Sequence, residues 1–276
     1  MSAKDLSTWW IYNMTKPKVL IFDLETAPKT AFVWGLFQQN VGINQLAADM
    51  YVLDWSAKWL DDEYVYSDSL HYHKLWDTEP DNDRIIVQSA WEMLDEADIV
   101  VGHNIDGFDI KTLNGRFLYH GISPPSHYQT IDTLKIARRR FKLTSNKLDF
   151  IAQMLGVGEK VVTGGFSLWA DIIVHKCRDA FDRMVTYCEG DVWITEAVYK
   201  KLQPWNNTTT SLVVQGQYEK PECNACGSSK IHKRGFYHTK TQSYQQYVCV
   251  DCGHCLRSKT AEKSPEGKKK NQLVSI

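Results

Sequence analysis

The stretch that decides the fold is VLIFDLET, residues 19–26. Its first four residues are apolar β-formers, which predicts a buried strand, and Ala27-Pro28 ends it. Side chains alternate across a strand, so Asp23 and Glu25 are expected on the same face. Two buried carboxylates repel each other and resist loss of water, and Mg²⁺ or Mn²⁺, which prefer oxygen ligands, would relieve both costs. A strand that simply runs out into a polar turn is the alternative that these residues leave open.

Length and composition bound the class of protein. The chain has 276 residues, enough for one sizeable domain and a small one. Apolar residues make up 43% and charged residues 24%, which is typical of a soluble globular protein. No apolar run is long enough to span a bilayer, and the first residues lack a signal-peptide pattern. We therefore expect a cytoplasmic protein without a membrane partner.

The net charge of −1 hides an asymmetry along the chain. Residues 220–276 carry 11 lysines and arginines against 4 acidic residues, whereas the first 219 residues carry 21 against 29. An acidic main part followed by a basic piece predicts a metal-loaded site beside a module that attracts nucleic acid.

Periodicity predicts an α/β fold for the acidic part. Helical spacing of apolar residues predicts helices at 81–98, 109–119, 147–155 and 179–202. Besides the first strand, short apolar runs predict strands at 51–55, 64–66, 99–102 and 130–133. A three-strand meander followed by alternating helices and strands gives a mixed sheet flanked by helices. Asp81 or Asp83 is expected to cap the helix at 81–98, a loop is expected over 158–166, and residues 32–50 receive no assignment.

Two other stretches could bring carboxylates to the end of the first strand. The sequence GHNIDGFD, residues 102–109, follows a predicted buried strand, and open α/β sheets build sites at strand ends. Tyr187 and Asp191 are four residues apart and therefore share one face of the predicted long helix. Without Asp191, Tyr187 would be interpreted as a core residue on an apolar helix face.

In this order, the three stretches resemble the three motifs of the DEDD superfamily of 3′–5′ exonucleases, which has a ribonuclease-H-like fold. Asp23-Leu24-Glu25 resembles the first motif, and Asn104 with Phe108-Asp109 resembles the second. Tyr187 and Asp191 resemble the third motif in its tyrosine form, called DEDDy. The similarity covers about residues 17–202, and it is strongest to proofreading domains of family B DNA polymerases and their stand-alone bacterial and phage relatives.

The resemblance implies a two-metal exonuclease. The ligands of two Mg²⁺ or Mn²⁺ ions would be Asp23, Glu25, Asp109 and Asp191. One ion would activate a water, and the other would stabilise the leaving 3′ oxygen. Tyr187 would orient the water rather than act as a base, because a reference pKa of about 10 keeps it neutral at pH 7.

Other side chains would contact the substrate. The resemblance implies that Leu24 and Phe108 pack against the terminal base, and that Asn104 holds the substrate or supports its own turn; Thr26 completes this group. The basic cluster at 135–142 is either a phosphate-contacting ridge or a solvated helix end; its candidate contacts are Arg138, Arg139 and Arg140. Three polar residues match no ligand position and are expected to be structural: His103, Asp106 and Asp132.

The cysteines near the C-terminus resemble a zinc ribbon. Two C-x2-C pairs stand 22 residues apart: Cys223 with Cys226, and Cys249 with Cys252. The glycine after each pair, Gly227 and Gly253, permits a tight turn, and the residues between the pairs alternate like a hairpin. All four positions would be filled by one structural Zn²⁺, which would supply the folding free energy of so small a piece. Cys255 is interpreted as a bystander.

We therefore predict five segments along the chain: an extension over 1–16, an exonuclease domain over 17–202, a polar linker over 203–219, the ribbon over 220–258, and a disordered basic tail over 259–276. The predicted substrate is single-stranded DNA or a frayed 3′ end, in replication or repair, in a bacterial or phage-infected cell. The ribbon would grip nucleic acid or dock a replication protein. An exoribonuclease and a non-catalytic nucleic-acid-binding adaptor are the alternatives.

Overall fold

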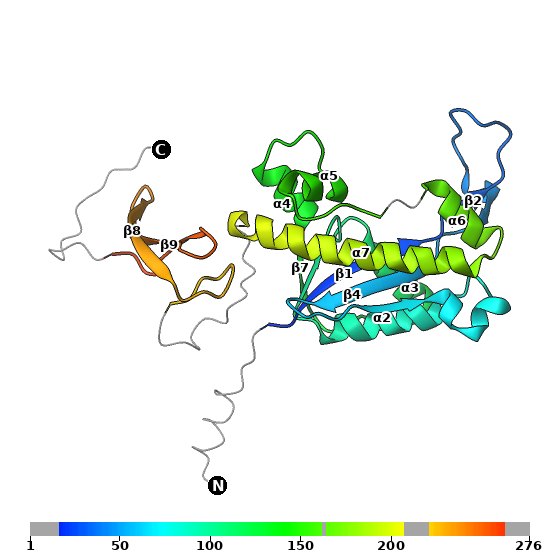
Figure 1. The fold of residues 1–276 in the computed structure, drawn as a ribbon, viewed down its shortest axis with the longest axis horizontal. Helices are drawn as coiled ribbons and strands as arrows, with labels where there is room; N and C mark the ends of the chain where they lie inside the picture. Colours follow the sequence, from blue (N-terminus) through cyan, green and yellow to red (C-terminus); the bar gives the residue numbers. More distant parts are fainter. Residues whose placement is uncertain (1–16, 162–163, 207–220, 263–276) are drawn as a thin grey trace, which may run out of the picture. The chain divides into compact units, whose positions relative to one another are not determined.

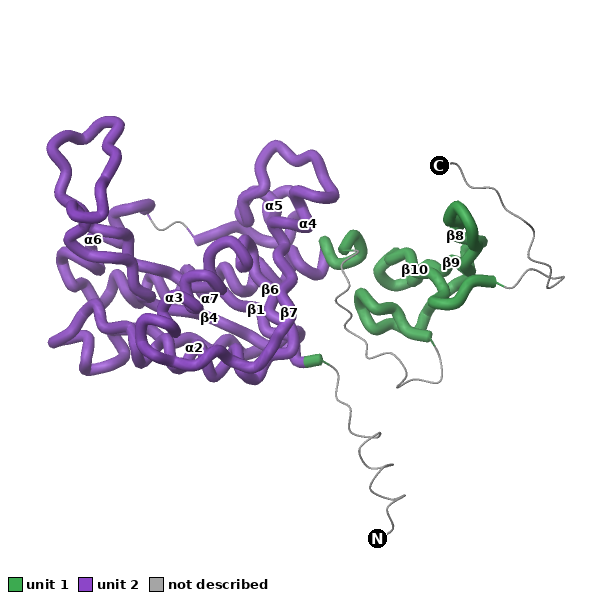
Figure 2. The backbone as a smooth tube through the Cα atoms, turned by 180° about the vertical axis from the view of Figure 1, so that it is seen from behind, with its two compact units in different colours: residues 1–17, 202–276 green, residues 18–201 purple. Residues whose placement is uncertain are grey.

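The computed structural model describes residues 17–161, 164–206 and 221–262. The chain divides into two compact units, residues 18–201 and residues 1–17 with 202–276 (Figure 2). The predicted N-terminal extension, most of the linker and most of the basic tail lie outside the described residues. Within the described ranges, every helix is too short or too polar to traverse a lipid bilayer.

The larger unit is built on a five-stranded mixed sheet, with the strand order β5-β4-β1-β6-β7 (Figure 1). The strands are β1 (Val19–Thr26), β4 (Val52–Trp59), β5 (Tyr66–Ser69), β6 (Ile99–Gly102) and β7 (Gln129–Asp132). β4 runs antiparallel to β1 and β5, whereas β1, β6 and β7 are parallel to one another. The meander followed by alternating helices and strands is therefore confirmed, although β5 starts two residues later than predicted.

Six α-helices of the described residues belong to this unit. They are α2 (Arg84–Glu96), α3 (Asp109–His120), α4 (Thr133–Arg140), α5 (Leu148–Leu155), α6 (Phe166–Ile173) and α7 (Arg178–Leu202). α6 was not predicted. The unassigned stretch contains β3 (Leu46–Ala48), which pairs with β2 (Thr30–Ala31), just before that stretch, in a second small sheet. Three short 3₁₀ helices of the described residues also lie in this unit: η1 (Ile43–Gln45), η2 (Leu70–Tyr72) and η3 (Lys74–Asp77). A fourth, η4 (Gln203–Trp205), follows α7 and belongs to the smaller unit.

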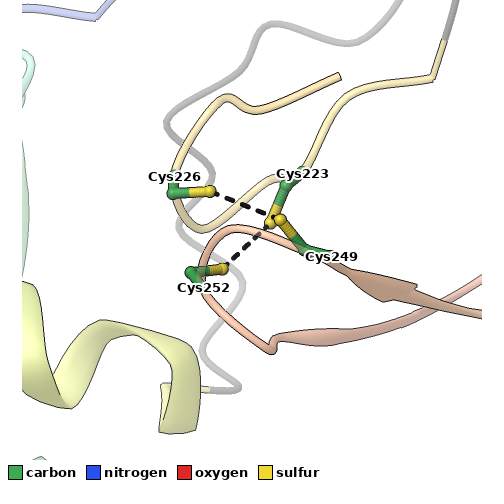
Figure 3. Close-up of side chains that lie close together, drawn as sticks. All are labelled: Cys223, Cys226, Cys249 and Cys252. Atoms are coloured by element: carbon green, nitrogen blue, oxygen red, sulfur yellow. Dashed lines mark hydrogen bonds between the residues drawn. The ribbon is translucent and has the colours of Figure 1, made fainter. Parts of the chain in front are cut away.

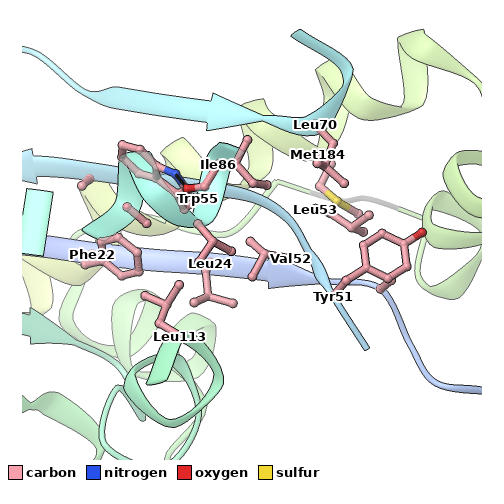
Figure 4. Close-up of a cluster of buried hydrophobic side chains, with 14 of the residues drawn as sticks. Phe22, Leu24, Tyr51, Val52, Leu53, Trp55, Leu70, Ile86, Leu113 and Met184 are labelled. Atoms are coloured by element: carbon pink, nitrogen blue, oxygen red, sulfur yellow. Dashed lines mark hydrogen bonds between the residues drawn. The ribbon is translucent and has the colours of Figure 1, made fainter. Parts of the chain in front are cut away.

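One face of the sheet packs against α2 and α3 to form the main core (Figure 4). Phe22 and Leu24 of β1 and Trp55 of β4 are each at most 3% exposed in this cluster. Because neighbouring side chains of a strand point to opposite faces, Asp23 and Glu25 lie on the other face. That face meets α7, where the Cys188 thiol lies 3.7 Å from Asp23 Oδ2. The predicted contact of Leu24 with a nucleotide base disagrees with this placement, since Leu24 is a core residue.

Asp83 corrects the predicted cap of α2. It occupies the N-cap position, but its side chain makes no capping hydrogen bond. Instead the buried carboxylate accepts a hydrogen bond from the Val52 N–H at 2.8 Å and pairs with Arg116 and His120 at 2.6 Å. It therefore joins β4, α2 and α3, which stabilises the packing of the core more than a local cap would.

The α7 face of the sheet contains a buried ion pair. Lys58 of β4 pairs with Glu196 of α7, and their side chains are 1% and 5% exposed. The same carboxylate accepts a hydrogen bond from the Asp61 N–H at 2.9 Å and pairs with Lys200 at 3.0 Å. Breaking a buried pair by removing one partner is costly, because the remaining charge stays desolvated.

The substitution Glu196→Ala should therefore lower the free energy of unfolding by about 3–5 kcal/mol, because Lys58 would remain buried without a carboxylate. Urea unfolding followed by circular dichroism measures this change. The control Lys200→Ala removes a side chain that is 46% exposed and should cost less than about 1 kcal/mol. Equal effects of the two substitutions would contradict this account of the buried pair.

The smaller unit contains a three-stranded antiparallel sheet in the order β10-β9-β8. Its strands are β8 (Ile231–His238), β9 (Ser243–Cys249) and β10 (Cys255–Arg257). The predicted hairpin between the two cysteine pairs corresponds to β8 and β9. Gly227 and Gly253 adopt φ values of +75° and +77°, which only glycine adopts without strain, so both predicted turns are confirmed.

Candidate active site

Three segments that are distant in the sequence bring carboxylates to the end of β1. Asp23 and Glu25 come from β1, Asp109 begins α3, and Asp191 lies in α7. Ligand oxygens of Asp23, Glu25 and Asp191 all lie within 4.8 Å of one another. Asp109 lies outside that group, yet its charge is the largest cause after burial of the raised pKa of Asp23. We call these four residues the carboxylate cluster.

Burial makes the carboxylate cluster reluctant to ionise. Burial is the largest cause of the raised pKa values, which reach about 8 for Glu25 and about 7 for Asp109. Repulsion from neighbouring carboxylates adds to the effect on Glu25 and Asp23. A bound cation would reverse this effect, since an opposite charge nearby favours the ionised form.

The residues present fit the predicted divalent cations. The Oδ1 atoms of Asp109 and Asp191 are buried and have no hydrogen-bond partner within the described chain. Buried acceptors without partners are costly, so these atoms are suited to a ligand that the chain does not itself supply. An oxygen-only donor set is the one that Mg²⁺ and Mn²⁺ prefer.

Asp54 is a further carboxylate that the sequence analysis missed. It lies opposite Glu25 in the β1–β4 register, and its charge raises the pKa of Glu25. Asp54 is fully buried, neither of its oxygens has a hydrogen-bond partner among the described residues, and burial raises its pKa to about 8. The sequence did contain a signal for Asp54, because a charged residue within a predicted buried strand is unusual.

Lys160 is the second residue that the sequence analysis missed. It lies between α5 and α6, where its ammonium pairs with Asp191 and donates a hydrogen bond to the Tyr187 hydroxyl at 2.9 Å. Its backbone N–H donates to Asp149 Oδ1 at 3.0 Å, which ties this loop to the first turn of α5. Burial opposes the charge of Lys160, but attraction and hydrogen bonding to Asp191 and Tyr187 together outweigh burial and raise its pKa. The chain thus places one cation of its own against the carboxylate cluster.

Tyr187 and Asp191 share a face of α7, as the spacing predicts. Burial raises the pKa of Tyr187 to about 12, so the hydroxyl stays protonated at neutral pH. It can therefore donate a hydrogen bond but cannot serve as a base, in accordance with its predicted positioning role.

The second motif forms a turn around Asn104, which adopts the left-handed conformation with φ +68°. The Asn104 carbonyl accepts hydrogen bonds from the N–H groups of Gly107 and Phe108 at 2.9 and 3.0 Å. This turn delivers Asp109 to the first position of α3. Asn104 thus supports its own turn, one of the two roles that were expected, and Phe108 remains 38% exposed.

The remaining predicted substrate contacts have different surroundings. Thr26 is half-buried at the end of β1, and its carbonyl accepts a hydrogen bond from Trp169. The basic residues Arg138, Arg139 and Arg140 form the exposed last turn of α4. The three residues expected to be structural all have partners: His103 lies 2.9 Å from Thr133 Oγ1, Asp106 pairs with Lys135 at 2.7 Å, and Asp132 caps α4.

The smaller unit contains the predicted group of cysteines (Figure 3). Ligand sulfurs of Cys223, Cys226, Cys249 and Cys252 lie within 4.8 Å of one another. The Cys223–Cys252 and Cys226–Cys249 sulfur pairs are 3.7 Å apart. Four sulfurs at about 2.3 Å from one tetrahedral Zn²⁺ would be about 3.8 Å apart. The cluster is therefore compatible with a structural zinc site, and Cys255 lies outside it.

Comparison with known proteins places this fold. A family model described as the RNase H superfamily matches residues 59–203. The chain belongs to the RNase H superfamily. The match contains Asp109, Tyr187 and Asp191, whereas β1 with Asp23 and Glu25 precedes it. Membership of the RNase H superfamily supports nuclease activity in general terms, and such nucleases typically use divalent metals.

The fold of this chain is similar to that of part of a solved protein structure. The family B DNA polymerase from the hyperthermophilic archaeon Pyrobaculum calidifontis matches with a TM-score of 0.52 and 18% sequence identity. The match covers 69% of this chain and 25% of the polymerase chain, so this chain spans about a quarter of that protein's length. A search of curated proteins found no match.

The metal-free protein should become less stable between pH 6.5 and 8.5. In this range the folded state holds protons on Glu25, Asp54 and Asp109 that the unfolded state has already lost, so stability falls as pH rises. Thermal melts in EDTA should show a midpoint of unfolding that falls by several degrees as the pH rises from 6.5 to 8.5. Addition of Mn²⁺ should raise the midpoint more at pH 8.5 than at pH 6.5. A metal-free midpoint that is constant or rises across this range would contradict the raised pKa values.

Purified protein should contain one equivalent of zinc, and Cys223→Ser should lose it, because three thiolates leave the tetrahedral site incomplete. Inductively coupled plasma mass spectrometry measures the content directly. Cys255→Ser is the matched control and should retain zinc, since Cys255 lies outside the sulfur cluster. Full zinc occupancy in Cys223→Ser would refute the four-cysteine site.

Proposed function

We propose that this chain is a divalent-metal-dependent 3′–5′ exonuclease that releases nucleoside 5′-monophosphates from single-stranded or frayed DNA. The observation that carries the proposal is the carboxylate cluster, in which ligand oxygens of Asp23, Glu25 and Asp191 lie within 4.8 Å of one another and the charge of Asp109 raises the pKa of Asp23. These residues come from the three stretches that resemble the DEDDy motifs. Membership of the RNase H superfamily supports the same class of chemistry.

Each residue of the site has a defined part in this proposal. The carboxylate cluster would hold two Mg²⁺ or Mn²⁺ ions, which when bound supply an activated water and stabilise the leaving 3′ oxygen. Tyr187 orients the attacking water through its protonated hydroxyl. Lys160, held between Tyr187 and Asp191, adds positive charge where the phosphate gains negative charge. The turn at Asn104 fixes Asp109 and presents the exposed ring of Phe108 to a terminal base.

The ribbon is proposed to grip the nucleic acid strand. Its surface has basic and aromatic groups in contact, with the Arg257 guanidinium 4.2 Å from the ring centroid of Tyr244 and 5.7 Å from that of Tyr237. Such pairs suit phosphate contacts and base stacking. Docking of a replication protein is the alternative for this surface.

The substitution Asp191→Asn should lower the cleavage rate of a single-stranded DNA by at least about 1,000-fold, because it removes the charge of a metal ligand. The assay uses strands labelled at the 5′ or the 3′ end, with Mg²⁺, Mn²⁺ or EDTA. With wild type, a 5′ label should appear in a ladder of shortening products, a 3′ label should appear at once in mononucleotide, and EDTA should stop both.

The matched control is Asp179→Asn, which changes an exposed carboxylate on the same helix and should keep wild-type activity. If wild-type protein leaves both labelled strands intact with either metal, the non-catalytic adaptor replaces the exonuclease. Faster cleavage of a matched RNA strand than of DNA would instead favour the exoribonuclease.

A further inference from the structure

A cavity of about 560 Å³ lies beside the carboxylate cluster. It is formed by α4 and α5, which are neighbours in Figure 1, and by the loop that carries Lys160. Its polar lining residues are His103, Arg138, Asn146, Lys147, Asp149, Lys160 and Tyr187. Because Lys160 and Tyr187 also contact Asp191, the cavity adjoins the place where the scissile phosphate is expected.

The charges of the cavity favour an anion. Three cationic side chains line the cavity, those of Arg138, Lys147 and Lys160, against one carboxylate, that of Asp149. That carboxylate already accepts hydrogen bonds from Gln153 at 2.9 Å and from the Lys160 N–H at 3.0 Å. Like charges around one cavity repel each other, and an anion bound between them removes this repulsion.

The three cations are not equivalent. Lys160 is committed to Asp191 and Tyr187. Arg138 and Lys147 are exposed, and neither makes an ion pair with any part of the chain that the structure describes. Free cations are notable here because the first 219 residues carry an excess of acidic side chains. Arg138 and Lys147 are therefore the lining cations that can accept an added anion.

The cavity also has features of a nucleotide site rather than of an ion site alone. Its volume lies within the range of about 300–1,000 Å³ that is common for small-molecule sites. Leu134 and Leu148 give it an apolar wall, and the buried Oδ1 of Asn146 has no hydrogen-bond partner within the described residues. A sugar or base can use these groups, and Arg138 can bind a phosphate through two parallel N–H groups.

We propose that this cavity binds the nucleotide on the 5′ side of the scissile bond, with Arg138 and Lys147 holding its phosphate, which is the first internal phosphodiester of the strand. The inference rests on the proposed function and adds a subsite to it. It also divides the basic cluster at 135–142, because Arg138 lines the cavity whereas Arg139 and Arg140 do not. The cavity thereby makes efficient cleavage depend on a strand of at least two phosphates.

The test compares Arg138→Ala/Lys147→Ala with Lys74→Ala/Lys111→Ala. The control pair removes two exposed lysines of the same unit that do not line the cavity. Two substrates separate the subsite from the chemistry: a single-stranded 12-mer, and the p-nitrophenyl ester of thymidine 5′-monophosphate, which has only the scissile phosphate. Binding of a fluorescent 12-mer with Ca²⁺ in place of Mg²⁺ is measured by anisotropy at several salt concentrations, and thermal melts check that all variants fold.

For the cavity pair, the Kd and the KM for the 12-mer should rise about 10- to 100-fold, and the slope of log Kd against log salt should fall by about 0.7, as expected for one lost phosphate contact. Hydrolysis of the ester should stay within about two-fold of wild type, and the control pair should change both substrates by less than about three-fold. An unchanged Kd for the 12-mer overturns the proposal. If the cavity pair loses as much activity on the ester as on the 12-mer, the proposal is also overturned, because the two cations would then act on the scissile phosphate.

Inhibition by free thymidine 5′-monophosphate identifies the source of the phosphate. The inhibition constant of thymidine 5′-monophosphate should be the same for wild type and the cavity pair. If the cavity pair raises this constant as much as it raises the Kd for the 12-mer, the cavity binds the released product, and the proposal is overturned. The Ca²⁺ binding experiment is independent of catalysis. If wild type binds the strand without cleaving it and the cavity pair loses that binding, the subsite stands while the proposed exonuclease activity fails.

Discussion

Repulsion among buried and half-buried carboxylates at the end of β1 is the constraint on which the larger unit depends. Burial is the largest cause of the raised pKa values of Asp23, Glu25 and Asp109. The side chains cannot move apart, because β1 fixes Asp23 and Glu25 while α3 fixes Asp109. The site therefore needs protons or cations to be stable, and cations are the option on which the proposed activity depends. Lys160 supplies part of the neutralising charge from within the chain.

The sheet keeps this polar site compatible with a stable fold by dividing its two faces. The face toward α2 and α3 is the apolar core, with Phe22 and Trp55 stacked at 6.0 Å between centroids. On the opposite face, three even-numbered side chains of β4 are polar: Asp54, Ser56 and Lys58. α7 covers this face, and the helix that delivers Asp191 to the site also delivers Glu196 to Lys58. Burial of apolar surface on one face can thus offset the cost of burying charge on the other.

The smaller unit follows a related principle with different ligand chemistry. Its buried residues are few, and they centre on Cys223, Ala225 and Cys249. So small a core cannot by itself stabilise three short strands, whereas a metal bound by four thiolates can. Partial loss of water raises the pKa of Cys226 to about 11, although this residue is exposed. For Cys249, hydrogen bonds from the N–H groups of Cys252 and Asp251 and from the neighbouring thiols together outweigh burial and lower the pKa to about 7. The two units are each organised around like groups that a cation would bring together, oxygen ligands in one and sulfur ligands in the other.

The sequence by itself determined those features that depend on neighbours within a few residues. Alternation places Asp23 and Glu25 on one face, helical spacing places Tyr187 with Asp191, and C-x2-C spacing pairs the cysteines. The same alternation assigns Leu24 to the core, and the resemblance to a family obscured that simpler inference. Only the tertiary structure decided that Asp54 lies opposite Glu25, because strand register depends on long-range packing. It also decided that Lys160, 31 residues from Asp191, reaches the site, because the path of a loop follows its anchoring contacts and leaves no periodic pattern in the sequence.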